Sequence, residues 1–262
     1  MMLVADNMQV INATVSKAME DMNSGPIRAL AAKCSARGAH AIDVNSGPLG
    51  KGAKQKMAFL IESVQEVTAL PILIDTANPV AMEAGLAVSR NPVIINGFSL
   101  EPVKMAGILP LAKKYNADII GYLLNSDSSV PLDSGERLTI ASQLLAAIEE
   151  EGISPERLII DPVIVPLSWE QGTFQAMEVL STLKLLPEVL GYPVRTIAGL
   201  SNLTSGSKCY KKSIWMENIY LPMLATANLS MVLLNIFHDE TVAVAKTCRI
   251  LEEGKIFSWE SI

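Results

Sequence analysis

The chain has 262 residues, of which 50% are hydrophobic and 18% are charged, and its formal net charge is -6. This large apolar fraction excludes an intrinsically disordered chain, and the length is sufficient to bury a substantial core. The acidic balance and the lack of Lys/Arg clusters argue against nucleic-acid binding and electrostatic membrane anchoring, because phosphates and anionic lipids require concentrated positive charge. We expect small molecules or another protein as partners, with no nucleic acid and no membrane.

Short runs of β-branched and aliphatic residues alternate along the chain with longer helix-like stretches, which is typical of βα units around a parallel sheet. The predicted strands are Leu3–Ala5, Ala39–Val44, Pro71–Ile74, Val93–Ile95, Asp118–Leu124, Leu158–Ile160, Val194–Ala198 and Met231–Leu234. The clearest predicted helices are Lys54–Thr68, Val80–Ser89, Glu101–Tyr115, Ser134–Glu151, Thr173–Leu190 and Thr241–Glu253.

The number of strands decides the fold class. No composition break or Gly/Pro/Ser linker divides the chain, and Leu158-Ile159-Ile160 is apolar on both faces, as in a strand covered by helices outside and by a packed interior. We therefore predict an α/β fold, a (β/α)8 TIM barrel that forms a single domain over residues 1–262. A doubly wound open sheet is the alternative, but it would struggle to seat eight consecutive units.

Asp or Asn residues stand at the end of almost every predicted strand, where a barrel has its catalytic face. They are Asp6, Asn7, Asp43, Asn45, Asp75, Asn96, Asn125, Asp161, Asn202, Asn235 and Asp239, with His238 beside the last strand. One such residue most often caps a helix or makes a turn, but several carboxylates in one mouth repel each other unless a ligand uses them. A 2-amino-4-oxo pteridine fits, because carboxylates accept paired hydrogen bonds and carboxamides both donate and accept.

The residue types at the strand ends also exclude other chemistry. Lys, Arg and Cys are absent there, which excludes a Schiff-base lysine, a cysteine nucleophile and an arginine phosphate clamp. His40 and His238 form no HxH or HExxH pair, so we predict no metal site, although a divalent metal is the rival explanation for clustered carboxylates. His40 is expected to be structural, whereas His238 can reach the mouth.

The cysteines and the N-terminus bear on the compartment. Cys34, Cys209 and Cys248 form no CxxC pair, which argues against a zinc ribbon and an iron–sulfur site. The first ten residues lack the basic start and apolar run of a signal peptide, and no apolar run is long enough to span a bilayer. We therefore expect a cytoplasmic protein with reduced thiols.

Several short motifs follow one another in a family-specific order. They are Asp43-Val44-Asn45-Ser46-Gly47-Pro48, Ile74-Asp75-Thr76-Ala77-Asn78 with Glu83-Ala84-Gly85-Leu86, Ile95-Asn96-Gly97, Ile160-Asp161-Pro162 and Ala198-Gly199-Leu200-Ser201-Asn202. With them the chain resembles, over essentially its whole length, the pterin-binding methyltransferases, specifically the methyltetrahydrofolate:corrinoid methyltransferases. Dihydropteroate synthase is a more distant relative of that family. The resemblance implies a barrel and a homodimer.

The resemblance also implies roles for individual residues. The pterin-recognising groups of the family fall on Asp75, Asn96 and Asp161. Its mobile asparagine, which hydrogen-bonds N5 of the folate, falls on Asn202, and Asp43 belongs to the network around N5. Asn202 and Asp43 are thus the expected catalytic residues. Further expected contacts come from Gly199 and Ser201, and the remaining candidates are Asp6, Asn7, Asn125, Asn235 and His238.

The reaction implied is transfer of a methyl group between N5 of tetrahydrofolate and the cobalt of a corrinoid. The corrinoid is expected on a separate partner protein, because the chain has no room for a cobalamin-binding domain. Either 5-methyltetrahydrofolate methylates the corrinoid, as in acetogenesis, or a methylcorrinoid methylates tetrahydrofolate, as in O-demethylation and in methylamine or betaine use.

Departures from the family pattern favour the second direction. The first loop reads Ala5-Asp6-Asn7-Met8-Gln9 where the family usually has Gly-Glu-Arg-Ile-Asn, and Met231, Asn235 and Tyr210 replace charged residues of close relatives. Two alternatives stay open, namely a dihydropteroate synthase and a folate-binding subunit without turnover of its own.

Overall fold

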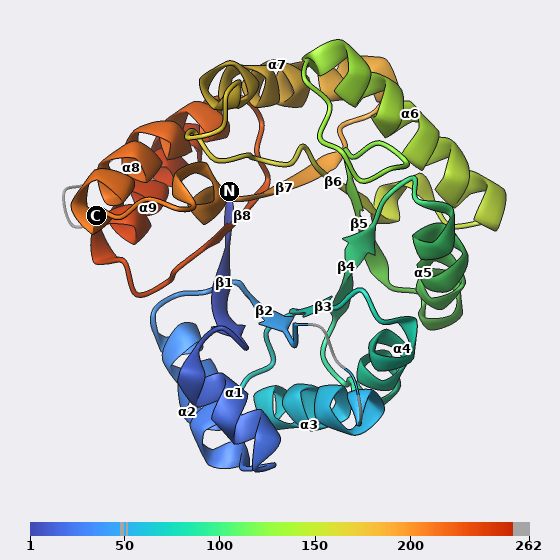
Figure 1. Cartoon of the computed structure of the whole chain (residues 1–262), viewed down its shortest axis with the longest axis vertical. Helices are drawn as coiled ribbons and strands as arrows, with labels where there is room; N and C mark the ends of the chain where they lie inside the picture. The colour runs from blue at the N-terminus through green and yellow to red at the C-terminus, as the bar shows by residue number, and fades with distance from the viewer. Residues whose placement is uncertain (48–49, 51, 254–262) are drawn as a thin grey trace.

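A computed structural model describes residues 1–47, 50 and 52–253, so Pro48 of the first motif lies outside the described residues. Eight parallel strands close into a barrel in which each strand pairs with its neighbours in sequence, and β1 pairs with β8. The helices surround this barrel in chain order (Figure 1). The predicted (β/α)8 fold class is confirmed.

All eight predicted strands are present, with small differences in their bounds. They are β1 (Met2–Gln9), β2 (Ala41–Asn45), β3 (Ile72–Asp75), β4 (Val93–Phe98), β5 (Asp118–Tyr122), β6 (Leu158–Asp161), β7 (Arg195–Gly199) and β8 (Met231–Leu234). The largest difference is in β1, which continues beyond Ala5 through Asp6 and Asn7. The pairing of β1 with β2 shifts register between Ala5 and Met8, so these two polar residues lie at a bulge.

The helices include three that the sequence pattern did not reveal. The helices of the described residues are α1 (Ala13–Glu20), α2 (Ser24–Ala36), α3 (Ala53–Gln65), α4 (Pro79–Val88), α5 (Pro102–Tyr115), α6 (Ser134–Glu151), α7 (Gly172–Leu190), α8 (Tyr210–Thr226) and α9 (Asp239–Glu253), with short 3-10 helices η1 (Pro155–Arg157) and η2 (Leu200–Thr204). The missed helices are α1, α2 and α8. At eight residues α1 is too short for a clear period, and α8 exposes Tyr210, Trp215 and Ile219, which blurs its apolar stripe.

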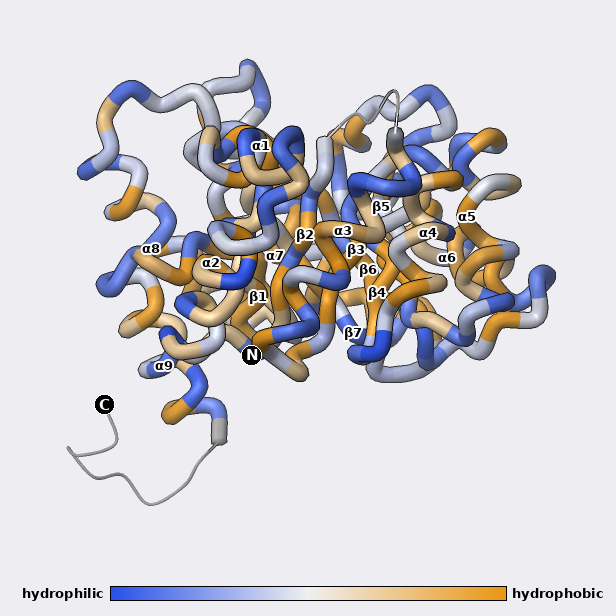
Figure 2. The backbone as a smooth tube through the Cα atoms, turned by 90° about the horizontal axis from the view of Figure 1, so that it is seen from below, coloured by the Kyte–Doolittle hydropathy of each residue, from blue (hydrophilic) through white to orange (hydrophobic). Residues whose placement is uncertain are grey.

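Local signals fix where two helices begin. Pro79 occupies the first turn of α4, where its missing N–H costs no hydrogen bond, and Asn78 caps the same helix through Val80 N–H. Asp133 caps α6 by accepting a hydrogen bond from Glu136 N–H at 2.9 Å. These starts place the helices over the outside of the barrel, whose strands are hydrophobic while the surrounding loops are hydrophilic (Figure 2).

One inward-facing residue from each strand forms an apolar layer inside the barrel. This floor layer is fully or almost fully buried and consists of Val4, Ala41, Leu73, Ile94, Ile120, Ile159, Ile197 and Met231. Below it, near the amino-terminal ends of the strands, Asp118 pairs with Arg195 at 2.8 Å and with Arg157 at 3.3 Å. Because side chains alternate along a strand, the residue two positions after each member of the floor layer again faces inward.

Candidate functional site

The inward-facing positions above the floor layer carry five of the polar candidates. Counting two residues onward from each floor residue gives Asp6, Asp43, Asp75, Asn96, Tyr122, Asp161, Gly199 and Leu233. The strand registers agree, since Asp75 pairs with Asn96 and Tyr122 pairs with Asp161. The fold therefore brings Asp6, Asp43, Asp75, Asn96 and Asp161 into one barrel interior, and we call Asp6, Asp43, Asp75 and Asp161 the carboxylate ring.

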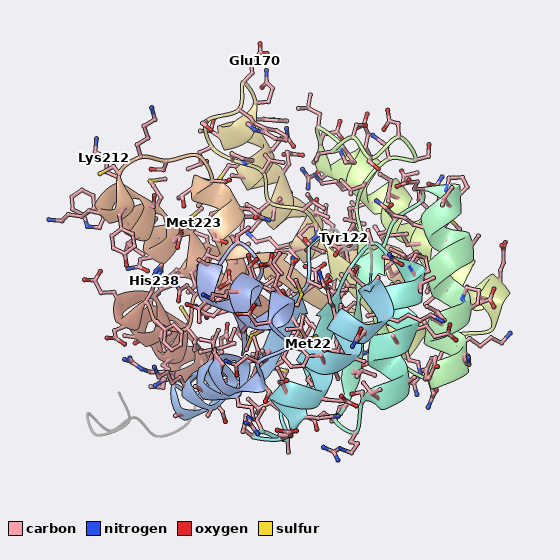
Figure 3. The ribbon with its side chains drawn as sticks, turned by 60° about the horizontal axis from the view of Figure 1, so that its bottom comes forward. Met22, Tyr122, Glu170, Lys212, Met223 and His238 are labelled. Carbon is pink, nitrogen blue, oxygen red and sulfur yellow. The ribbon has the colours of Figure 1, made fainter. Side chains whose placement is uncertain are left out.

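Asn96 lies at the centre of a buried hydrogen-bonded triad. Its Nδ2 donates to Asp43 Oδ1 at 3.0 Å, and its Oδ1 accepts a hydrogen bond from the Tyr122 hydroxyl at 2.5 Å. Burial, followed by the charge of Asp75, raises the pKa of Asp43 well above its ordinary value, against the hydrogen bond from Asn96. Tyr122, which lies inside the barrel in Figure 3, was not predicted, because a tyrosine in a strand is usually read as a strand former.

Asp75 is held by the end of the neighbouring strand. Asn45 Nδ2 donates to Asp75 Oδ2 at 2.5 Å, while Asn45 Oδ1 accepts from Gly47 N–H at 2.8 Å. Burial raises the pKa of Asp75 to about 6, and the bond from Asn45 opposes the shift. A carboxylate held this way stays available to a ligand that brings N–H donors.

Asp161 is oriented by a strained segment that follows β6. Its Oδ1 accepts a hydrogen bond from Val163 N–H at 2.8 Å, and Val163 has φ +62°, a left-handed conformation that is unfavourable for a β-branched residue. Burial raises the pKa of Asp161 to about 7, and the Val163 N–H and the charge of Arg137 oppose this shift. Strain of this kind clusters at binding sites, where surrounding contacts hold it in place.

Arg137 supplies the contacts that hold this segment. Its side chain is fully buried beneath the barrel rim, where Nη1 donates to the carbonyls of Pro162 and Val163 and Nη2 donates to Gln175 Oε1 at 3.1 Å. Among the described residues it is the cation that lowers a pKa in the carboxylate ring. Sequence reasoning missed Arg137, since a lone arginine in an amphipathic helix is ordinarily assigned to the solvent face.

Asn202 lies on the 3-10 turn η2, which we call the Asn202 turn. The turn is anchored by buried Leu200 and Leu203, whereas Asn202 itself is exposed. The Asn202 side chain lies against Gly199, where an added Cβ would be only 3.0 Å from Asn202 Nδ2. Ser201 Oγ donates to Asp6 Oδ2 at 3.5 Å and links the turn to β1. Burial and the charge of Glu217 raise the pKa of Asp6 to about 6.

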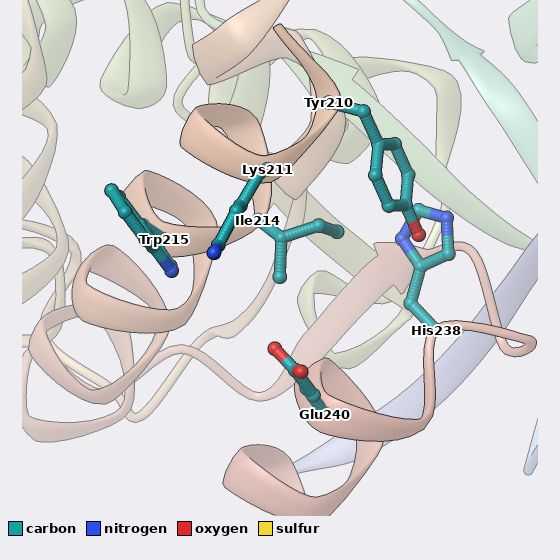
Figure 4. Close-up of a pocket in the computed structure, with 6 residues that line it drawn as sticks. All are labelled: Tyr210, Lys211, Ile214, Trp215, His238 and Glu240. Carbon is teal, nitrogen blue, oxygen red and sulfur yellow. The ribbon is translucent and has the colours of Figure 1, made fainter.

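A second polar cluster joins the bulge in β1 to the loop after β8. Asn7 Nδ2 donates to Asn235 Oδ1 at 2.6 Å, and Asn235 Nδ2 lies 2.9 Å from His238 Nε2. The His238 ring meets Tyr210 edge-on at 5.4 Å between centroids. Beside them lies a cavity of about 390 Å³ that Lys211, Ile214, Trp215 and Glu240 complete (Figure 4).

The candidate Asn125 and the histidine expected to be structural, His40, have local structural partners instead. Asn125 Nδ2 donates to Ser129 Oγ at 3.0 Å, and the Asn125 backbone carbonyl accepts from Ser128 N–H, so this asparagine shapes its own loop. His40 Nδ1 accepts a hydrogen bond from Leu3 N–H at 3.0 Å near the opposite end of β1, which is the structural role expected of it.

The carboxylate ring is rich in hydrogen-bond acceptors. In the part of the chain that the structure describes, no three His, Cys, Asp or Glu side chains are grouped as metal ligands. The arrangement instead presents several oxygen acceptors in one interior, together with the carboxamide of Asn96. It suits a flat ligand that carries several N–H donors.

Comparison with known proteins gives a consistent result. A family model described as "Pterin binding enzyme" matches residues 8–234. A curated protein of Eubacterium limosum, the methylcorrinoid:tetrahydrofolate methyltransferase, is 24% identical over 208 residues, which cover 79% of this chain and 75% of that protein.

Solved structures with a similar fold include two dihydropteroate synthases. The enzyme of Stenotrophomonas maltophilia, with imidazole in its active site, has a TM-score of 0.73 at 19% identity and covers 97% of this chain and 94% of its own. The Yersinia pestis enzyme in complex with a sulfonamide drug has a TM-score of 0.73 at 12% identity, covering 97% and 95%. At such identities the likeness concerns the fold.

Proposed function

Because the chain belongs to the family of pterin binding enzymes, we propose that its carboxylate ring binds the pterin of tetrahydrofolate in a methyl transfer to or from a corrinoid. The chain is a methyltransferase of the tetrahydrofolate/corrinoid kind, as its relative in Eubacterium limosum is named. Both the folate and the corrinoid are substrates. A separate corrinoid protein as partner is part of the proposal.

The observation that carries this proposal is the set of Asp75, Asn96 and Asp161 on three strands of one barrel interior. A 2-amino-4-oxo pteridine has an amino group and a ring N–H on one edge, and these donors match a carboxylate that accepts two hydrogen bonds. Asn96 offers a carboxamide whose orientation Asp43 and Tyr122 fix. The fit therefore depends on chemical type and on orientation together.

Asn202 is proposed to serve N5 of the folate. In the direction toward tetrahydrofolate, N5 gains a methyl group, becomes positively charged and loses its proton, while the bonding electron pair of the methyl–cobalt bond stays on cobalt. The Asn202 carboxamide can accept a hydrogen bond from N5 or donate one to it by rotation, because its side chain is exposed beside Gly199, which has no side chain to block it. Its contribution is then largest in the transition state.

The ring carboxylates are proposed to accept the released proton. Asp6, with a pKa of about 6, and Asp43, with a pKa raised well above its ordinary value, lie in the same interior as the proposed pterin. A group whose pKa lies near the working pH exchanges protons most effectively. The raised pKa values caused by burial thus suit the proposed chemistry.

The direction of transfer is proposed to run from a methylcorrinoid to tetrahydrofolate. The name of the Eubacterium limosum relative supports this direction, as do the altered first and eighth loops. We place the chain in a methyl-donor system of the O-demethylase, methylamine or betaine type. The likeness to the dihydropteroate synthases concerns the fold alone, so it supports no other direction of methyl transfer.

An assay in both directions tests the proposal. Methylcob(III)alamin with tetrahydrofolate, and cob(I)alamin with 5-methyltetrahydrofolate, are incubated anaerobically with the protein while the corrinoid spectrum is recorded. We expect conversion in both mixtures, with the first favoured at equal concentrations. Binding of tetrahydrofolate without conversion in either mixture would contradict the proposal and indicate a folate-binding subunit. Condensation of a pterin pyrophosphate with p-aminobenzoate would instead indicate a dihydropteroate synthase.

Pterin affinity is expected to fall as the pH is lowered through 7. The proposed complex needs an ionised Asp161, whose pKa is about 7 in the free protein, so below that pH a proton must leave before the ligand binds. The release of this one proton lowers the affinity about tenfold for each pH unit below 7. Below about pH 6, protonation of Asp75 lowers the affinity further. Calorimetric titration with tetrahydrofolate between pH 5.5 and 8.5 measures this, with the ionisation of the ligand alone as the control. A constant affinity over this range would contradict the assignment.

The remaining features support a reducing compartment and a dimer as further parts of the proposal. Cys34, Cys209 and Cys248 are free thiols, which are usual in the cytoplasm. Exposed apolar side chains gather on the neighbouring helices α7 and α8, and such surfaces are typical of interfaces between subunits. They are Phe174, Met177, Leu185, Val189, Trp215, Met216 and Ile219.

None of the helices that the structure describes is long and apolar enough to cross a membrane.

A further inference from the structure

The buried carboxylate of Glu217 has entered the site described so far only through its charge, which raises the pKa of Asp6. Glu217 lies in the middle of α8 with 7% of its surface exposed, and the Thr204 hydroxyl donates to its Oε1 at 2.6 Å. Among the described residues no Lys, Arg or His forms a salt bridge with it. Burying a carboxylate without a cationic partner is costly, so the hydrogen bond from Thr204 is what compensates Glu217 here.

The partner of Glu217 is the last residue of the Asn202 turn. Thr204 ends this turn at one side, and Ser201, near the other side, donates to Asp6. The turn is therefore held between two carboxylates, one on α8 and one on β1, with Asn202 between the two contacts. Leu200 and Leu203 anchor it to the apolar core, whereas the short Thr204 hydrogen bond to Glu217 is directional and fixes how the turn is rotated.

We propose that Glu217 is a positioning residue for Asn202, which it acts on through Thr204 while Asp6 holds the opposite side of the turn through Ser201. This inference rests on the proposed function, because Asn202 matters only if it meets a reacting substrate. Glu217 itself lies behind the turn and touches Thr204. Its effect on the reaction is thus indirect.

The two carboxylates also influence each other. The charge of Glu217 is the second cause, after burial, of the raised pKa of Asp6. The other groups that face Asp6 are Ser201 from the turn, Asp43 from β2 and Cys34 from α2, and among the described residues no cation faces it. Replacing the charge of Glu217 should therefore lower the pKa of Asp6 and move any dependence on Asp6 to lower pH.

Variants separate the two effects of Glu217. Thr204→Val removes the hydroxyl contact while keeping the shape of the side chain, and Glu217→Ala removes it from the other side. We expect each to lower kcat for methyl transfer about five- to tenfold, as loss of one hydrogen bond implies, with KM for tetrahydrofolate changed less than twofold. Amide hydrogen exchange over residues 200–205 should quicken by a similar factor. Glu217→Gln can still accept from Thr204, so it should keep a normal kcat at pH 8, while the carbon-13 carboxyl titration of Asp6 moves to lower pH.

Matched controls exclude general damage. Thr182→Val removes a buried hydroxyl contact within α7, and Glu150→Gln removes an exposed acid in the last turn of α6, so neither should change kcat, turn exchange or the titration of Asp6. The inference is overturned if Thr204→Val and Glu217→Ala leave both kcat and exchange unchanged, or if Glu217→Gln loses as much activity as Glu217→Ala. If wild-type protein transfers no methyl group, the proposed function fails while the exchange measurement still reports whether Glu217 holds the turn.

Discussion

Asp161→Asn is expected to lower pterin affinity at least a hundredfold and, at the same time, to make the ligand-free protein more stable. The asparagine can keep the hydrogen bond from Val163 N–H, because its Oδ1 accepts as the carboxylate does. Its Nδ2, however, would meet the N–H donors of the pterin, and two facing donors repel. Loss of a charged acceptor in a buried site costs about 3 kcal/mol, which corresponds to the expected loss of affinity.

The gain in stability follows from the sign of the pKa shift. The folded-state pKa of Asp161 lies at about 7, above its ordinary value of 3.8, so folding favours the protonated acid. Stability is therefore lost as the pH rises from about 4 to about 7, by at most about 4 kcal/mol at about 1.4 kcal/mol per unit. An asparagine does not titrate, so we expect the variant to gain about 1–3 kcal/mol at pH 8 and nothing near pH 4.

Urea unfolding at pH 8 and pH 4.5, together with calorimetric pterin titration, measures both effects. Asp21→Asn, at an exposed acid at the end of α1, is the control that should change neither quantity. Tight pterin binding by Asp161→Asn would refute the role assigned to this carboxylate. A variant that is less stable than the wild type at pH 8 would show that the ionised acid is stabilised by contacts other than those described.

Asn202→Ala is expected to lower the rate of methyl transfer about ten- to a hundredfold while tetrahydrofolate affinity stays within about twofold. The truncation leaves Leu200, Leu203 and the two hydroxyl contacts of the turn in place, so the turn should keep its position. What is lost is a carboxamide that follows the change of charge at N5, and such a contact contributes about 1–3 kcal/mol in the transition state.

Single-turnover kinetics with methylcob(III)alamin separate this rate from binding. Asn23→Ala, which removes an exposed carboxamide that caps α2, is the matched control and should transfer the methyl group at the normal rate. Equal losses in rate and in affinity would instead assign Asn202 to ground-state binding, as in a folate-binding subunit.

The sequence predicted the barrel and most of the carboxylate ring because both follow from local patterns. Strands such as Leu158-Ile159-Ile160 carry enough apolar residues to be recognised alone, and Asp161 comes directly after them. Successive side chains of a strand point to opposite faces, so the position of Asp75 and Asp161 in their strands is enough to predict that they face the interior. No information about distant contacts is needed. Whether these residues bind a pterin stays a prediction.

The partners of these residues could not be predicted in the same way. Arg137 contacts the carbonyls that follow Asp161, and Glu217 contacts the hydroxyl of Thr204, but each is a charged residue in a helix whose sequence does not say which neighbour it meets. Tyr122 was missed for another reason. The predicted strand continued to Leu124, so Asn125, and not Tyr122, was taken as the polar residue at the strand end. Contacts between elements depend on how helices rotate against the barrel, and tertiary packing decides that rotation.

The floor layer of eight apolar side chains has a consequence for traffic through the molecule. Because this layer fills the barrel toward the amino-terminal ends of its strands, the interior opens only at their carboxyl-terminal ends. Both substrates of the proposed reaction must therefore enter from that end. In the proposed reaction, the folate that lies against the carboxylate ring would enter first, and the proposed corrinoid partner would then cover the opening above it. In the proposed direction, the methylated folate would leave only after the corrinoid partner has dissociated, so the second substrate to bind would be the first product to leave.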